Sequence, residues 1–390
     1  MRGRCDRRLP RGDVGGRVRP GSDGLRRPGR ARGPRGLSRL RRFDRAALEA
    51  DLDAARFSGV VHLVGEDDEA PLTIERGLAD RAAGIPNRGS TRFAVASISK
   101  LITGVTVARL VDRGELDWAT RYVDVVPAEW RPPALDPSVT IGDLLGHTSG
   151  FGDYFDEEDP DADYAEIWRR IPPGTMRGPK DFWPLLRDLP QKDRPGRRAV
   201  YNNGAYVLVG IAIEEVLGHP FPDVVADEVF APLGMTRSGY WPLDGVEPDL
   251  AIGYEPPGDD RGAWRTNVHA VPVMGGPDGG VQVTVEDLVR LIDGVSGRGS
   301  AGATFLAAGT RAALIGPHSA SDDGVFRFGR GVLHVGDGPS ARFGHTGEDP
   351  GASARIWTYP ATGERVAVVS NITDGAGAIT RRIDALLAES

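Results

Sequence analysis

Apolar positions along the chain follow two different periods. Between Ile98 and Val111 they recur every three to four residues, which predicts a helix that opens at Ser97 and ends at Gly114. The same period predicts further helices, whereas short apolar runs bounded by glycine or proline predict β-strands. The further predicted helices are 44–52, 206–217 and 376–388, and the predicted strands are 59–64, 328–335, 354–359 and 365–370.

Strands and helices are predicted at both ends of the chain. We therefore expect the N- and C-terminal parts to build one antiparallel sheet with flanking helices, an α/β fold of the α+β type. The middle of the chain is predicted to be mainly helical and rich in loops. The predicted domain covers 43–390, with an α/β lobe at about 43–115 and 276–390 and a helical lobe at about 116–275.

Charge is spread unevenly along the chain. Residues 1–42 contain 15 arginines and three aspartates, a net charge of +12; the whole chain carries −7, which leaves −19 for residues 43–390. The first 42 residues also hold nine glycines and four prolines and lack an apolar run, so we expect a disordered tail. The acidic body is not expected to bind nucleic acid.

The arginine-rich tail has two interpretations. One is an arm that binds nucleic acid or an anionic membrane. The other is an over-extended reading frame with a true start such as Val14 or Val18, because no methionine lies between Met1 and Met176. No stretch reaches the ~18–20 apolar residues of a membrane span, and no signal peptide is visible. We therefore expect a soluble, cytoplasmic protein without membrane contact.

Candidate chemistry begins with Ser97 and Lys100. Their spacing on a helix places them on the same face, so the lysine amine can reach the serine hydroxyl, whereas Ser99 points elsewhere. A serine hydroxyl is a weak nucleophile unless a nearby base takes its proton, and a lysine whose pKa is lowered by burial can do so. We interpret Ser97 as a nucleophile and Lys100 as its base.

Four further segments accompany this pair along the chain. Together with the serine segment, they resemble in order and spacing the motifs of the serine β-lactamase and penicillin-binding protein superfamily. The five segments are 93–100, 144–150, 201–204, 232–236 and 344–347. The similarity is to its class C β-lactamase and DD-peptidase branch and runs from about Phe43 to the C-terminus. It implies a β-lactamase/transpeptidase-like fold and a serine hydrolase that cleaves an ester or amide bond through an acyl-serine intermediate.

The resemblance also implies roles for residues outside the serine motif. Tyr201 would relay the proton from Ser97 to the leaving group, and Asn203 would bind the substrate carbonyl and the lysine. The alternatives are an ordinary buried tyrosine and a helix cap. Backbone N–H groups of Ser97 and Glu348 would form an oxyanion hole. The candidate catalytic residues are thus Ser97, Lys100 and Tyr201, and the candidate substrate-binding residues are Asn203, His345, Thr346, Gly347 and Glu348.

The last motif departs from the β-lactamase pattern. Class C β-lactamases carry Lys-Thr-Gly where this chain has His345-Thr346-Gly347. A mostly neutral histidine offers less positive charge to a substrate carboxylate, which favours an esterase or a D-amino-acid peptidase of the DD-peptidase type. The alternatives are a class C-like β-lactamase, an acyltransferase or peptide cyclase on the same fold, and a non-catalytic penicillin-binding sensor. A glycine needed only for a turn at the end of a strand is also possible.

Other polar segments are predicted to shape the site. The segment 144–150 lacks the Gly-x-Ser-x-Gly pattern and follows a helix capped by Thr140, so His147 is predicted to be structural. The acidic and aromatic stretch 153–168 is predicted to form a wall of the cleft, and the glycine-rich stretch 275–280 a turn or a wall.

Metal and cofactor chemistry has no support in the sequence. The seven histidines show no zinc-ligand spacing, and the only cysteine is Cys5. No phosphate-binding loop is present. We therefore expect no metal and no cofactor, and a small-molecule or peptide substrate.

Overall fold

A computed structural model describes residues 40, 43–66, 70–257 and 262–389. The described residues form one compact unit. The predicted disordered tail, 1–42, lies outside the described residues except for Leu40.

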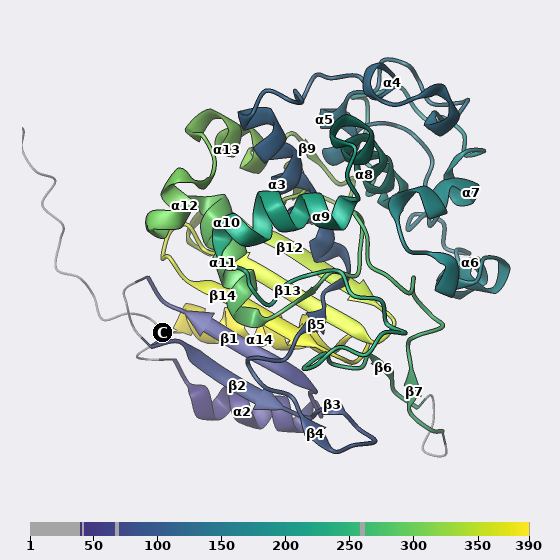
Figure 1. The fold of residues 1–390 in the computed structure, drawn as a ribbon. Helices are drawn as coiled ribbons and strands as arrows, with labels where there is room; N and C mark the ends of the chain where they lie inside the picture. The colour runs from purple at the N-terminus through teal and green to yellow at the C-terminus, as the bar shows by residue number, and fades with distance from the viewer. Residues whose placement is uncertain (1–39, 41–42, 67–69, 258–261, 390) are drawn as a thin grey trace, which may run out of the picture. The chain divides into compact units, whose positions relative to one another are not determined.

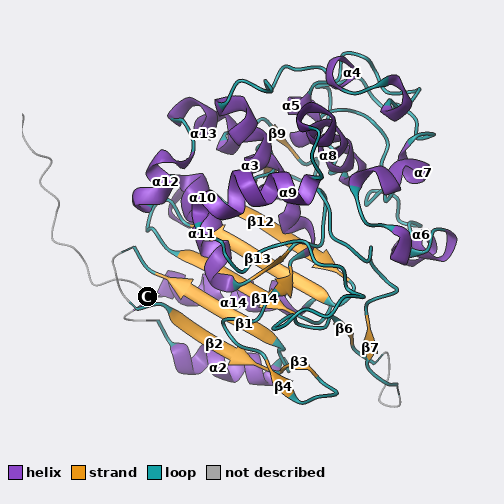
Figure 2. Ribbon diagram, in the orientation of Figure 1, coloured by secondary structure: helices purple, strands orange, loops and turns teal. Residues whose placement is uncertain are grey.

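The centre of this unit is an eight-stranded antiparallel sheet (Figures 1 and 2). The strand order is β2-β1-β14-β13-β12-β11-β10-β9, so the first strands of the chain pair with the last. This confirms the prediction of one antiparallel sheet built from both ends. The strands are β1 Gly59–Val64, β2 Leu72–Arg76, β9 Ser319–Ala320, β10 Arg327–Phe328, β11 Leu333–Val335, β12 Arg342–Asp349, β13 Ala352–Thr358 and β14 Arg365–Ser370.

The predicted single strand 328–335 is wrong, because the structure contains two short strands there, β10 and β11, joined by a turn. Gly331 in this turn has a φ of +85°, a conformation that favours glycine. A Cβ at Gly331 would stand 2.5 Å from the Lys100 carbonyl oxygen. The turn therefore depends on a close tertiary approach that the local apolar pattern does not record.

Helices cover both faces of the sheet (Figure 2). Helices α2 (Arg45–Ala54) and α14 (Gly375–Glu389) pack on one face, and α11 (Val285–Ser296) packs on the other. Side chains of β1 alternate between the two cores: Val60 belongs to one, and Val61 and Leu63 belong to the other. Burial of both faces explains why these strands are continuous apolar runs.

Two long helices place the site beside the sheet. Helix α3 (Ser99–Asp112) packs against α8 (Asn203–Leu217), and both are buried along most of their length. A Cβ at Gly210 of α8 would stand 2.1 Å from the side chain of Pro277, so only glycine allows the 275–280 segment to lie this close. The remaining helices are α4 Tyr122–Val125, α5 Ile141–Leu145, α6 Tyr164–Arg170, α7 Trp183–Leu186, α9 Phe221–Val225, α10 Ala231–Leu233, α12 Gly299–Phe305 and α13 Ala308–Ile315.

Short strand pairs complete the fold. Strand β5 (Phe93–Ala94), which directly precedes the serine segment, pairs with β8 (Gln282–Val283), which follows the glycine-rich segment. The two segments are thereby held side by side. The other pairs are β3 Leu78–Asp80 with β4 Ile85–Pro86, and β6 Tyr254–Glu255 with β7 Arg265–Thr266.

Candidate active site

Ser97 lies in a short 3₁₀ turn, Ala96–Ile98, immediately before α3. The sequence predicts a helix that opens at Ser97, whereas α3 begins at Ser99. The 3₁₀ segment nevertheless leaves Lys100 one helical turn after Ser97. The Lys100 Nζ lies 3.0 Å from the Ser97 Oγ. Ala96 has a φ of +48°, which is uncommon for a residue with a side chain and is a form of local strain found at functional sites. The expected pairing of Ser97 with Lys100 is present.

Lys100 is completely buried and its amine has three polar neighbours. Besides Ser97, the Nζ donates to the Asn203 Oδ1 and to the Asp278 backbone carbonyl, each at 2.7 Å. Both of these groups only accept hydrogen bonds, so a neutral amine that satisfies them points its lone pair at the Ser97 hydroxyl. Burial lowers the pKa of Lys100, although nearby carboxylates oppose the shift. The arrangement suits a lysine that removes the serine proton.

Asn203 is held by a carboxylate at the N-terminus of α8. Asp153 accepts from the Asn203 and Gly204 backbone N–H groups at 2.7 and 2.8 Å, and from the Asn203 side-chain amide at 3.1 Å. The helix cap is Asn202, whose Oδ1 accepts from the Ala205 N–H. The alternative that Asn203 is only a cap is therefore wrong, because its side chain contacts Lys100 instead.

Tyr201 stands beside Ser97 and Lys100. Its ring centroid lies 4.9 Å from the Lys100 Nζ, and its hydroxyl is close enough to the Ser97 side chain to be affected by it. Burial raises the pKa of Tyr201 well above the ordinary tyrosine value, so the phenol keeps its proton. The ring stacks on His147, with centroids 4.7 Å apart. We name Ser97, Lys100, Tyr201 and Asn203 the catalytic network.

His147 supports this network from behind. Its ring is buried, and its Nδ1 accepts from the Asn202 N–H at 3.0 Å. The short helix α5 ahead of it has the predicted capping box between Thr140 and Asp143. These contacts agree with the structural role predicted for His147.

Strand β12 carries the last motif past Ser97. Its partner β11 pairs only with the first three residues of β12, as far as Gly344, and the following part lies against the serine turn. A Cβ at Gly347 would stand 2.1 Å from the Val95 carbonyl oxygen and 3.0 Å from the Ser97 nitrogen. Only glycine permits this approach of the strand to the Ser97 backbone. The oxyanion hole predicted from Ser97 and Glu348 stays a prediction.

His345 and Thr346 do not line the cavity beside Ser97. The His345 ring is fully buried, and burial lowers its pKa to about 3, so it is neutral. Its Nδ1 lies 2.6 Å from the Thr346 carbonyl oxygen. The predicted substrate contacts of these two residues stay predictions. The neutral His345 ring is buried and is not part of the cavity lining.

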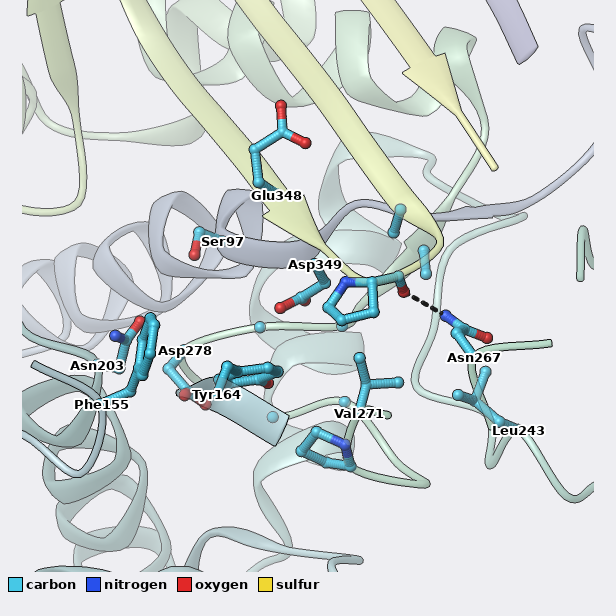
Figure 3. A pocket seen from close by; sticks show the side chains of 18 of the residues that line it. Ser97, Phe155, Tyr164, Asn203, Leu243, Asn267, Val271, Asp278, Glu348 and Asp349 are labelled. Atoms are coloured by element: carbon cyan, nitrogen blue, oxygen red, sulfur yellow. Dashed lines mark hydrogen bonds between the residues drawn. The ribbon is translucent and has the colours of Figure 1, made fainter. Parts of the chain in front are cut away.

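The cavity itself has a volume of about 290 Å³ and opens on Ser97 and Asn203 (Figure 3). The two segments predicted to form walls both contribute to it, through residues of 153–168 and 275–280. Four lining residues carry carboxylates, and we name them the acidic wall. They are Glu157, Asp278, Glu348 and Asp349.

The sequence reasoning missed three residues of this site. Asp153 was noted only as part of an acidic loop, although it anchors Asn203. Asp278 acts on Lys100 through a backbone carbonyl, which no side-chain pattern reveals. Asp349 could have been found, because alternation along a strand puts it on the same face as Gly347.

Neither a cluster of metal ligands nor a membrane-spanning helix occurs in the described part of the chain. Within it, no three His, Cys, Asp or Glu side chains converge as metal ligands would. Among its helices, none has the length and apolar character needed to cross a membrane.

Comparison with known proteins adds to this geometry. The sequence profile of the Beta-lactamase family matches residues 45–389. Esterase EstB from Burkholderia gladioli is 36% identical over 212 residues, which cover 51% of this chain and 53% of the esterase. Penicillin-binding protein 4 from Amycolatopsis lactamdurans is 28% identical over 357 residues, covering 84% of this chain and 86% of that protein.

A solved structure has the same fold. The penicillin-binding protein from Bacillus halodurans superposes with a TM-score of 0.79 and 33% sequence identity. The match covers 87% of this chain and 99% of that one.

Proposed function

This chain belongs to the β-lactamase family and is a serine hydrolase, and on that premise we propose that it cleaves an ester or amide bond through an acyl-enzyme on Ser97. One observation carries the proposal. The Lys100 Nζ is buried, lies 3.0 Å from the Ser97 Oγ, and has only acceptors as its other partners. A neutral amine so placed can take the serine proton.

The proposed reaction begins with the attack of the Ser97 Oγ on the substrate carbonyl carbon while the serine proton moves to the Lys100 Nζ. Collapse of the tetrahedral intermediate breaks the bond to the leaving group, which receives the Tyr201 hydroxyl proton. The proton on Lys100 then returns to Tyr201. A raised pKa suits this donor, because the phenol is protonated at neutral pH.

Water completes the cycle by the same steps in reverse order. It attacks the acyl carbonyl, loses its proton to the network, and releases the acid with Ser97 restored. The proposed oxyanion donors are the backbone N–H groups of Ser97 and Glu348, with Gly347 keeping the strand close. Asn203 positions both Lys100 and the substrate carbonyl. His345 and Thr346 support strand β12.

Ester hydrolysis is the activity we favour. The described residues that line the cavity include no lysine, arginine or histidine to pair with the carboxylate of a β-lactam. Similarity to esterase EstB points in the same direction. Transfer of the acyl group to an amine or alcohol would use the same acyl-enzyme.

The test is hydrolysis of short-chain p-nitrophenyl esters by wild type, Ser97→Ala and Ser340→Ala. Ser340 is an exposed serine on a distant turn, so its variant controls for the loss of a hydroxyl. We expect Ser340→Ala to match wild type and Ser97→Ala to lose ester turnover. Nitrocefin assayed in parallel should be turned over far more slowly than the esters. Equal ester turnover by Ser97→Ala would contradict the proposal.

A further inference from the structure

The charges around the cavity are unbalanced. Its charged lining residues are the four acidic residues of the acidic wall, and none of the described lining residues is a lysine, arginine or histidine. Lys100 is the basic residue of the catalytic network, but it is completely buried and does not line the cavity. A ligand in this cavity therefore meets an excess of negative charge.

Two of the four carboxylates already have partners. Glu348 pairs with Arg355 at 2.6 Å and accepts from the Ser353 hydroxyl at 2.9 Å. Asp278 accepts from the Tyr154 hydroxyl. Within the described part of the chain, the Asp349 and Glu157 carboxylates make no hydrogen bond or ion pair, and Glu157 is exposed to solvent whereas Asp349 is half-buried. Asp349 is thus the half-buried carboxylate without a partner.

The position of Asp349 relates it to the nucleophile. It lies two residues after Gly347 on β12, so its side chain leaves the strand on the same face that approaches Ser97 at Gly347. Two residues of a strand place it roughly 7 Å beyond Gly347. A Cβ at Gly279 would lie 3.7 Å from an Asp349 carboxylate oxygen and 3.9 Å from the Ala96 carbonyl carbon. In Figure 3 the Asp349 side chain points into the cavity, whereas that of Glu348 points away.

The energetics of Asp349 favour a positively charged neighbour. Burial raises its pKa to about 7, the Asp278, Glu348 and Glu157 charges add to the shift, and Lys100 opposes it. A half-buried carboxylate without a partner is unfavourable unless a cation pairs with it.

Aromatic rings complete the surroundings. Phe155 and Tyr164 line the same cavity, and burial raises the pKa of Tyr164, with the nearby Asp349 charge adding to the shift. Rings and carboxylates around one space are the usual surroundings of an organic ammonium group. The carboxylates do not converge as a metal site would, among the residues that the structure describes.

We propose that the enzyme prefers substrates whose acyl group carries an ammonium a few bonds from the scissile carbonyl, and that Asp349 determines this specificity. The inference rests on the proposed function, since it names the substrate class of the same site. Asp349 binds the ammonium, Tyr164 and Phe155 pack around it, and Ser97 attacks the carbonyl. A substrate with a carboxylate in this position is repelled.

The test uses three p-nitrophenyl esters that differ in one group. They carry 4-(trimethylammonio)butanoate, 5,5-dimethylhexanoate, and glutarate as its monoester. The first two are isosteric and differ in a fixed charge, so their kcat/KM ratio isolates recognition of the cation. We expect wild type to favour the cationic ester over the neutral one by about tenfold, and to hydrolyse the anionic ester most slowly.

Asp349→Asn should bring the cationic-to-neutral ratio close to one. The control is Asp337→Asn, which removes a carboxylate that is 86% exposed and paired with Arg327, and it should keep the wild-type ratio. A wild-type ratio of one or less, or an unchanged ratio in Asp349→Asn, would overturn the proposal.

Calorimetry with butyltrimethylammonium keeps the proposal testable without turnover. Wild type should bind this cation, and folded Asp349→Asn should bind it several-fold more weakly. Equal binding by the two proteins would overturn the assignment of Asp349. Failure of the proposed function would look different, because no ester would then be hydrolysed and Ser97 would not react, while calorimetry would still report on the cavity.

Discussion

The catalytic network, which reaches the cavity through Ser97 and Asn203, and the acidic wall of the same cavity are built in opposite ways. In the network, the Lys100 amine has three polar neighbours and Asn203 is fixed by Asp153. In the wall, Asp349 is half-buried without a partner. A satisfied network fixes geometry, which chemistry needs, whereas an unsatisfied wall leaves interactions for a ligand to complete. The contrast assigns reactivity to one region and substrate choice to the other.

The largest effects should come from the catalytic network. Lys100→Ala and Tyr201→Phe should each lower kcat by several orders of magnitude, because each removes a step of the proton relay from Ser97. The double variant should be little worse than either single one, because the residues act as a unit. Steady-state kinetics on the neutral ester measures this, and additive losses would show that the two residues act independently.

A backbone displacement should have the next largest effect. In Gly347→Ala the new Cβ would meet the Val95 oxygen at 2.1 Å, so the strand or the serine turn must shift. We expect a loss of about 10²-fold in kcat on every ester. Gly309→Ala on α13 is the matched control, since no atom beyond its chain neighbours and its own helix backbone lies within 4 Å of the position that its new methyl group would take, and its kinetics should not change. Wild-type kinetics in Gly347→Ala would refute the close approach.

The acidic wall should act through pH as well as through charge. The pKa of Asp349 is about 7, so its carboxylate is mostly ionised at pH 8 and mostly protonated at pH 6. The cationic-to-neutral ratio of kcat/KM should therefore fall several-fold from pH 8 to pH 6. Burial also raises the pKa of Asp153 to about 7, but Asp153 titrates in both assays and cancels in the ratio. A ratio that stays constant over this range would show that Asp349 does not determine substrate choice.

The smallest effect should be on stability. A carboxyl group whose pKa is raised by folding binds its proton more tightly in the native state, so its contribution to stability is lost as pH rises through about 7. Asp349→Asn has no charge to bury and should raise Tm by a few degrees at pH 8, and by less at pH 5. Thermal unfolding of this variant beside Asp337→Asn checks the sign. A lower Tm at pH 8 would mean that Asp349 has a stabilising partner.

The catalytic network could be predicted from the sequence in two ways: the pair of Ser97 and Lys100 from local spacing, and Tyr201 and Asn203 from the resemblance to a known family. Lys100 is one turn from Ser97, and strands such as 365–370 are continuous apolar runs. The antiparallel sheet follows from the strands predicted at both ends of the chain, and the family follows from the order and spacing of the motifs.

The remaining features depend on contacts between distant segments. The turn at Gly331 depends on the approach to α3, and Asp278 acts through its main chain. The buried position of His345 depends on how far β12 enters the core, which residue types alone do not specify. These are tertiary effects, so a single sequence carries no local signal for them.

The central claim is that Ser97 forms the acyl-enzyme, and mass spectrometry tests it most directly. Wild type is incubated with the cationic p-nitrophenyl ester, quenched in acid within the first turnovers, and digested. The account predicts one 4-(trimethylammonio)butanoyl group on the peptide that contains Ser97, and none in Ser97→Ala. An acyl group on another residue would contradict the account. So would turnover of the ester by wild type without a detectable acyl-Ser97, provided that the same conditions trap a fluorophosphonate adduct.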